Sequence, residues 1–320
     1  MALLEVKNLK MYFQTMRGYV KAVDDVSFEL NKGDTFGLAG ESGCGKTSTA
    51  LAILRLLPWN GEILGGKILF DNVDLVGMSD DQFRDEYRWK QISAIFQGAM
   101  NALHPTIHIG DQIAEPIIAH ENVGKKEALE RTAKLLDLVG IGAERINRYP
   151  HELSGGLKQR TVTAMALACN PSLIIADEPT TALDVIVRAQ VLKAMRELQQ
   201  KLNLSMIIIS HDLSMLAETC NKIAIMYAGK IVEFGSIVHI FKEPLHPYTQ
   251  KLIGAFPSVI GPKTQLSSIH GFPPDLLNPP SGCRFHARCS HVMEICRTKE
   301  PEIVNKDGTE HKVACHLVGA

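Results

Sequence analysis

A glycine-rich stretch with a lysine and a hydroxyl is the first set of residues in this chain that can do chemistry. Residues 40–47 read Gly-Glu-Ser-Gly-Cys-Gly-Lys-Thr, after an apolar run at Thr35–Ala39 and before a helical pattern over Lys46–Leu57. Glycines let the backbone turn its amides toward phosphate oxygens, and the N-terminus of the following helix adds a favourable dipole. Lys46 supplies a charge for the outer phosphates, and the Thr47 hydroxyl can bind Mg²⁺. The stretch predicts a phosphate-binding P-loop rather than an ordinary glycine-rich turn.

A pair of carboxylates forms the second chemical feature. Asp177 and Glu178 follow the apolar run Leu173–Ala176. Parallel sheets bind ligands at the C-terminal ends of their strands, so we expect Asp177 to face a metal ion and Glu178 a water. Alone, two acids at a strand end would be an ordinary solvated cap. Together with the P-loop they predict the second half of a nucleoside triphosphatase site.

A third motif points to a family. Residues 153–160 read Leu-Ser-Gly-Gly-Leu-Lys-Gln-Arg; in this pattern Ser154 begins a helix and the glycines permit close approach of another group. Placed before the Asp-Glu pair, the motif resembles the signature of ATP-binding cassette (ABC) ATPases. Gln97 matches the glutamine loop of that family, Ala182-Leu183-Asp184 its aspartate loop, and His211 its switch histidine. The resemblance covers residues 3 to 240.

The resemblance implies two nucleotide-binding subunits, as a homodimer or heterodimer, that sandwich two ATP molecules. The residues implied to bind the phosphates of one ATP are Gly40, Ser42, Gly43, Cys44, Gly45, Lys46, Thr47 and Ser48. Mg²⁺ would be bound by Thr47, Gln97 and Asp177. The signature residues implied to reach the ATP of the partner subunit are Ser154, Gly155, Gly156 and Gln159. Glu178 would be the general base and His211 would contact the γ-phosphate. Phe13 fits the adenine-stacking position, with Tyr12 and Tyr19 as rivals.

Two further segments indicate one branch of the ABC family. Pro244–Thr249 and Glu178–Val185 resemble the oligopeptide and dipeptide importers, whose relatives also carry nickel or oligosaccharides. This implies two integral-membrane permease subunits, an extracytoplasmic substrate-binding protein as an indirect partner, and a place on the cytoplasmic face of the membrane. Residues 98–105 differ from the usual sequence after the glutamine loop. Residues 98–120 are the expected permease contact.

The composition weighs against the other classes of cassette protein. Lys and Arg total 34 against 35 Asp and Glu, a net charge of −1, so charge gives no reason to expect nucleic acid as a partner. A DNA-repair or ribosome-associated ATPase is the main alternative, and a scaffold that binds ATP without hydrolysis is another. The start, Met1–Lys10, is interrupted by charged residues, so it lacks the apolar core of a signal peptide and we expect a cytoplasmic protein.

A cysteine cluster lies outside these motifs. Of seven cysteines, Cys283, Cys289, Cys296 and Cys315 fall in the last 38 residues. Zinc prefers closer pairs, although His286, His291, His311 or His316 could serve as ligands. An iron–sulfur cluster needs four thiolates and tolerates wider loops. Importer subunits with this tail resemble carriers of a [4Fe-4S] cluster, which favours that reading over zinc, free thiols or disulfides.

These residues need an α/β scaffold. Leu4–Phe13 and Lys67–Leu75 alternate like half-buried antiparallel strands, whereas the compact runs at residues 35–39, 173–176 and 206–209 suit buried parallel strands. A helical pattern covers Val185–Leu202. We therefore expect an ABC ATPase core over residues 1–242, with an antiparallel β subdomain and a helical subdomain inserted over about 98–170. A proline-rich linker and the cysteine-containing extension would occupy residues 243–320.

Overall fold

The computed structural model describes residues 2–181, 183–255, 269–306 and 310–318. The chain forms two compact units. The first consists of Leu30–Thr35 and Gly77–Ile209 with the first three residues, and the second contains Leu4–Glu29, Phe36–Val76 and the chain from Ser210 onwards. Ala182 of the expected aspartate loop lies outside the described residues.

The first unit is built on parallel strands. β6 (Ile92–Ile95), β7 (Leu173–Asp177) and β8 (Ser205–Ile209) pair in parallel, with β7 in the middle. Every residue of β7 and β8 is buried, which is why these strands appear in the sequence as unbroken apolar runs. α6 (Val185–Leu202) has the predicted bounds and buries Val191, Met195 and Leu198 on one face.

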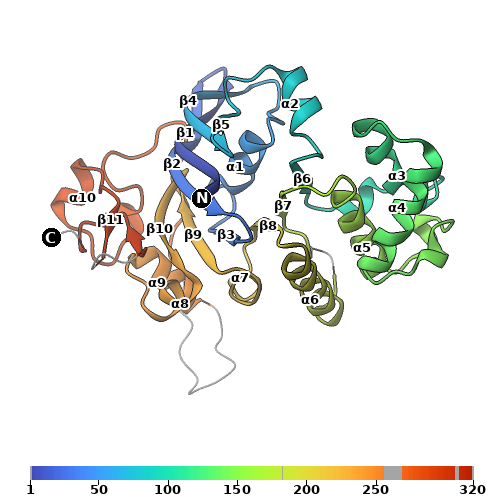
Figure 1. Ribbon diagram of the computed structural model, residues 1–320. Helices are drawn as coiled ribbons and strands as arrows, with labels where there is room; N and C mark the ends of the chain where they lie inside the picture. Colours follow the sequence, from blue (N-terminus) through green and yellow to red (C-terminus); the bar gives the residue numbers. More distant parts are fainter. Residues whose placement is uncertain (1, 182, 256–268, 307–309, 319–320) are drawn as a thin grey trace. The chain divides into compact units, whose positions relative to one another are not determined.

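Helices occupy the stretch between β6 and β7. α3 (Ile109–His120), α4 (Lys125–Leu138) and α5 (Gly155–Ala166) lie together at one end of this unit (Figure 1). Their apolar faces meet, with Ile113, Ile117 and Leu136 fully buried. A short 3₁₀ turn at Ala99–Ala102 precedes α3, and two more at Ala143–Arg145 and Pro150–Glu152 lie between α4 and α5.

The second unit carries its own strands. β3 (Thr35–Ala39) pairs in parallel with β9 (Lys222–Tyr227), and β9 pairs with antiparallel β10 (Lys230–Ser236). The helices that accompany them are α1 (Lys46–Ile53), α7 (Leu213–Thr219) and α8 (Ile237–Lys242). α1 starts where predicted but ends earlier, because Arg55 takes a left-handed backbone conformation with φ of 50°.

A separate sheet in this unit has the strand order β2-β1-β4-β5. β1 (Ala2–Thr15) and β4 (Gly61–Phe70) pair antiparallel, as predicted for the Leu4–Phe13 segment, and β2 spans Gly18–Asn31. The prediction of one strand over Lys67–Leu75 was wrong. Asp71 and Asn72 have φ of 45° and 68°, which makes a tight hairpin turn between β4 and β5 (Val73–Asp74).

The C-terminal extension is folded onto the second unit. α9 (Pro247–Gly254) begins where a linker was expected, because proline is compatible with the first turn of a helix. Further along are α10 (Glu294–Thr298), β11 (Val304–Asn305) and β12 (Lys312–Val313). β12 pairs antiparallel with β10 and β11 pairs with β12, so the extension adds strands beside β10 (Figure 1). Prolines 257 and 262 lie outside the described residues.

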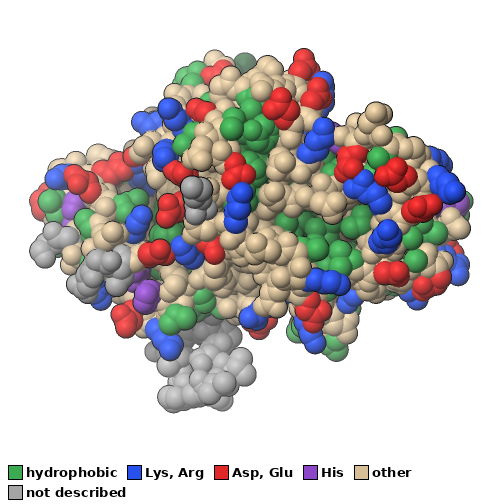
Figure 2. Space-filling view, viewed as in Figure 1, with side chains coloured by type: hydrophobic (Ala, Val, Ile, Leu, Met, Phe, Trp, Pro, Cys, Tyr) green, Lys and Arg blue, Asp and Glu red, His purple; other side chains and the backbone are tan. Residues whose placement is uncertain are grey.

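The surface agrees with the balanced composition. On the face shown in Figure 2, Lys and Arg side chains are interspersed with Asp and Glu side chains. Within the described part of the chain, no helix combines the length and the apolar character that crossing a membrane requires.

Candidate ATP-binding and catalytic residues

The P-loop connects β3 to α1, and its glycines are required by its backbone. Gly40 and Gly45 have φ of 147° and 107°. A Cβ on Gly40 would lie 2.2 Å from the carbonyl oxygen of Met226, and one on Gly45 would lie 2.2 Å from that of Ala22. Since neighbouring backbone cannot move aside easily, only glycine fits at these two positions.

Lys46 is held across the P-loop. Its side chain is buried, and its Nζ donates hydrogen bonds to the carbonyl oxygens of Gly40 at 2.8 Å and Glu41 at 3.0 Å. Cys44 is also buried, with its Sγ 3.6 Å from Nζ, and burial raises the pKa of this thiol. Cys44 therefore packs beneath the loop as a neutral thiol, while Lys46 presents a fixed charge.

The outer side of the P-loop is accessible. Ser42, Gly43 and Thr47 are exposed, and Ser48 is half-buried. The first amides of α1 follow Gly45, which has no side chain to cap them, and such amides bind anions. His211 is also exposed and directly precedes α7, whose N-terminus is capped by Asp212. The second unit thus offers a phosphate-binding loop and an accessible imidazole.

In the first unit, the C-terminal ends of β6 and β7 bring together Glu178, the predicted general base, and Gln97. Ile95 pairs with Ala176, so Gln97 and Glu178 lie at the same edge. The Nε2 of Gln97 donates to Oε2 of Glu178 at 3.2 Å, and the Thr181 hydroxyl donates to the same oxygen at 3.0 Å. Asp177 is buried at the end of β7. Sequence reasoning did not single out Thr181, although it lies within the Glu178–Val185 motif.

The backbone also fixes Glu178. Its φ of 47° is left-handed, which is uncommon for a residue other than glycine, and its amide donates to the carbonyl oxygen of Ile209 at 2.9 Å. Strained backbone at the end of a buried strand is frequent at active sites. The backbone of Glu178 is therefore fixed by its amide hydrogen bond to Ile209, and Gln97 and Thr181 both orient its carboxylate.

The signature residues begin α5. Ser154 and Gly155 are exposed, and within the described structure the Ser154 side chain makes no capping hydrogen bond to the helix. A Cβ on Gly156 would lie 2.7 Å from Cγ1 of Val187, so this glycine allows α5 to approach α6. Gln159 is buried, and its Nε2 has no hydrogen-bond partner among the described residues. Its contact with nucleotide stays a prediction.

The three candidate aromatics have different surroundings. The Tyr12 hydroxyl donates to Asp24 at 2.7 Å, and burial together with this bond raises the Tyr12 pKa. The Tyr19 hydroxyl lies 3.3 Å from Glu62. Phe13 follows Tyr12 in β1 and so points to the opposite face of the strand. Tyr12 and Tyr19 are thus engaged in contacts within the sheet.

The Pro244–Thr249 motif joins the extension to β10. Glu233 of β10 is fully buried, and its carboxylate accepts hydrogen bonds from the backbone amides of Leu245 at 2.7 Å and His246 at 3.0 Å. Nε2 of His311, from the distal part of the extension, lies 2.8 Å from the same carboxylate. The His246 Nδ1 accepts from the amide of Tyr248 and caps α9.

The four clustered cysteines surround one pocket. Cys283, Cys289, Cys296 and Cys315 line it together with Phe285 and several histidines. Burial raises the pKa of Cys283 to about 11 and also raises the pKa of Cys289 and Cys315. Among the described residues, no three His, Cys, Asp or Glu side chains are grouped as one metal ion requires. The four cysteines predicted as one ligand set thus line the same pocket, and their binding of a metal or a cluster stays a prediction.

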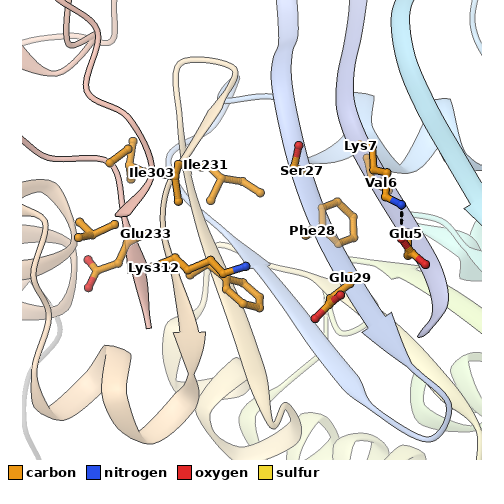
Figure 3. A pocket seen from close by; sticks show the side chains of 14 residues that line it. Glu5, Val6, Lys7, Ser27, Phe28, Glu29, Ile231, Glu233, Ile303 and Lys312 are labelled. Atoms are coloured by element: carbon orange, nitrogen blue, oxygen red, sulfur yellow. Dashed lines mark ion pairs between the residues drawn. The ribbon is translucent and has the colours of Figure 1, made fainter. Parts of the chain in front are cut away.

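Another pocket, of about 190 Å³, lies among β1, β2, β10 and β12 (Figure 3). Its walls include Phe28, Ile231 and Ile303, and Glu5 pairs with Lys7 at its rim. None of the P-loop residues lines it. This pocket is therefore not part of the phosphate-binding loop.

Comparisons with known proteins agree with these motifs. The ABC transporter family model matches residues 23–181, and the model of the oligopeptide/dipeptide transporter C-terminal region matches residues 232–296. The chain is 46% identical to the dipeptide transport ATP-binding protein DppD of Bacillus subtilis, over 98% of this chain and 94% of that protein. It is 43% identical to the oligopeptide transport ATP-binding protein OppD of Escherichia coli, over 94% and 89%.

Solved structures show the same fold. The dimeric ABC transporter cassette MJ0796 matches with a TM-score of 0.64 at 24% identity, covering 73% of this chain and 98% of that one. CbiO1 of Clostridium perfringens, a part of the ABC transporter complex CbiONQ, matches with a TM-score of 0.65 at 24% identity, covering 76% of this chain and 91% of that one. The chain belongs to the ABC transporter family of ATPases, in the branch that carries the oligopeptide/dipeptide transporter C-terminal region.

Proposed function

We propose that this protein is the ATP-hydrolysing subunit of an importer for dipeptides or oligopeptides. The observation that carries this proposal is the orientation of Glu178 by Gln97 and Thr181 at the end of a buried parallel strand. A complete P-loop and the Glu233-anchored Pro244–Thr249 motif support it. The names of the relatives support peptides as cargo; nickel and oligosaccharides are the alternatives.

We assign the residues of the ATP site the following roles. Backbone amides from Gly43 to Ser48 and the Lys46 ammonium bind the phosphates. Thr47, Gln97 and Asp177 are the ligands proposed for Mg²⁺, which neutralises phosphate charge when bound. Glu178 takes the proton of the attacking water, and His211 contacts the γ-phosphate. Phe13 is our choice for the adenine stack, because the Tyr12 hydroxyl is engaged by Asp24.

We further propose that two such subunits close head to tail on ATP. Ser154, Gly155 and Gly156 would bind the γ-phosphate held by the partner subunit, for which the exposure of Ser154 and Gly155 at the start of α5 is suited. Two permease subunits would hold the dimer at the cytoplasmic face of the membrane, contacting residues 98–120. Closure by ATP would then be the step that drives the permeases.

Substitution of the general base tests this function. Glu178→Gln keeps a side chain of the same shape that can still bond Gln97 and Thr181, but it cannot accept a proton. We expect it to bind ATP, form a stable dimer by size-exclusion chromatography, and lose at least about 100-fold in turnover, as removal of a general base does. Near-normal phosphate release would contradict the role of Glu178.

We also propose that the four cysteines bind a [4Fe-4S] cluster, with zinc as the alternative. The support for this proposal is that all four cysteines line one pocket, since a cluster of this kind needs four thiolates. Its proposed role is to stabilise the extension. Anaerobically purified protein should be brown, absorb at about 400 nm and contain about four irons per chain. A colourless protein with one zinc per chain would contradict the cluster.

A further inference from the structure

The P-loop contains a carboxylate that is bound by the C-terminal extension. Glu41 is the second residue of the P-loop, and Arg288 lies directly before Cys289. The two form a bidentate pair, with Nη1 to Oε2 at 2.6 Å and Nη2 to Oε1 at 2.9 Å. The Arg288 side chain is 6% exposed and the Glu41 side chain 25%. Such a pair is stronger and more directional than an exposed ion pair.

Other groups of the second unit orient the Arg288 guanidinium. Its Nε donates to the carbonyl oxygen of His270 at 2.9 Å and its Nη2 to that of Ile269 at 3.3 Å. The guanidinium lies 5.7 Å from the ring centroid of Tyr227 and donates to its hydroxyl at 3.3 Å. The position of Arg288 is thus set by the extension and by β9 as well as by Glu41.

A second contact holds the backbone of Glu41. The Glu41 amide donates to the hydroxyl of Tyr248 at 2.9 Å. Tyr248 is fully buried, and its ring packs against Tyr227 and Phe285 with centroids 4.7 and 5.3 Å apart. The backbone of this P-loop residue is therefore held by Tyr248 within the Pro244–Thr249 motif, and its side chain by Arg288 further along the extension.

The negative charge of Glu41 affects how the P-loop can bind ATP. Glu41 adjoins the exposed Ser42 and Gly43, and its carbonyl oxygen accepts from Lys46, so its carboxylate belongs to the loop that must bind a polyanion. Without Arg288 that carboxylate would repel the phosphates and could bond Lys46 or loop amides itself. We propose that Arg288 is a positioning residue for ATP binding, neutralising and immobilising Glu41 so that the affinity for nucleotide depends on the C-terminal extension. This inference rests on the proposed ATPase function.

The test is the equilibrium Kd of a fluorescent ATP analogue, together with kcat and KM for ATP hydrolysis, on the full chain. Arg288→Ala should raise Kd and KM about tenfold, which corresponds to about 1.4 kcal/mol, with kcat changed by less than about twofold. Arg288→Lys should have Kd and KM values between those of the parent and of Arg288→Ala, because lysine keeps the charge but loses the bidentate geometry. Adding Glu41→Gln to Arg288→Ala should restore Kd to within about threefold of the parent, because it removes the repulsive charge.

Arg284→Ala is the matched control. Arg284 also belongs to the extension and is buried, but it bonds Asp24 and the carbonyl oxygen of Ala228 instead of the P-loop. An unchanged Kd in Arg288→Ala, equal weakening in Arg284→Ala, or failure of Glu41→Gln to rescue would each overturn the inference. If Arg288→Ala does not fold, the Kd of Arg288→Lys is compared with the Kd of the double variant Arg288→Lys/Glu41→Gln, and the same outcomes decide. A parent protein that does not bind ATP would instead overturn the proposed function.

Discussion

Replacing Glu233 with alanine should release the C-terminal extension from β10. The Glu233 carboxylate accepts two backbone hydrogen bonds, from Leu245 and His246, and contacts His311 at 2.8 Å. Its side chain is fully buried, so no water can take over these bonds in the folded protein. The variant would leave two amides and an imidazole without their acceptor.

The magnitude follows from that geometry. One hydrogen bond to a charged group contributes about 1.5–3 kcal/mol, and leaving buried partners unsatisfied costs about 1–3 kcal/mol each. Because the three bonds share one acceptor, their energies do not add in full, so the combined cost is about 3–5 kcal/mol. The free energy of local opening at this junction should fall by that amount.

Native-state hydrogen exchange measures this directly. The amides of Leu245 and His246 should exchange about 100-fold to several thousand-fold faster in Glu233→Ala, since about 1.4 kcal/mol is a factor of ten. Glu302→Gln, an exposed acid of the same extension, is the control and should leave both rates unchanged. Protection of Leu245 and His246 equal to that of the parent protein would refute the argument that Glu233 anchors the extension.

Two further predictions concern single positions. Desolvation lowers the pKa of buried His246 from 6.5 to about 4, so between these pH values the unfolded chain binds a proton that the folded chain does not. The protein should therefore lose up to about 3 kcal/mol of stability as the pH falls from 6.5 to 4. Urea unfolding of His246→Asn, which keeps a capping acceptor, should show a smaller loss over this range, and an equal loss would exclude His246 as the cause. Gly45→Ala would place a Cβ 2.2 Å from the Ala22 carbonyl oxygen, and nucleotide titration should show at least about tenfold weaker ATP binding; unchanged affinity would contradict the need for glycine there.

Much of the fold could be predicted because its signals are local. Buried parallel strands such as Thr35–Ala39 are unbroken apolar runs, and the stripe of α6 repeats at helical spacing. The turn at Asp71 and Asn72 was missed because alternation continues on both sides of it, so two short strands appear as one. Pro247 was taken as a helix breaker although it occupies the first turn of α9, where proline is tolerated.

The sequence indicates which residues are candidates for the site, but it does not indicate which of them contact one another. The P-loop, Glu178 and the signature belong to contiguous motifs, so the sequence alone identifies them as candidates. Glu41 and Arg288 are 247 residues apart, and no local pattern indicates that an acid in one motif pairs with a base in another. Tyr248 was noted only as part of a branch motif, since its hydrogen bond to the P-loop depends on how α9 packs.

The pairing of β12 with β10 changes which strand lies at the margin of the sheet. β10 has seven residues, and its unpaired amides and carbonyls would be a template for pairing with other chains. With the extension in place, the sheet instead ends on β11, a strand of two residues, which is too short for such pairing. A chain truncated after Lys242 should therefore aggregate through its exposed β10 edge, even though every ATP-binding motif would remain in it.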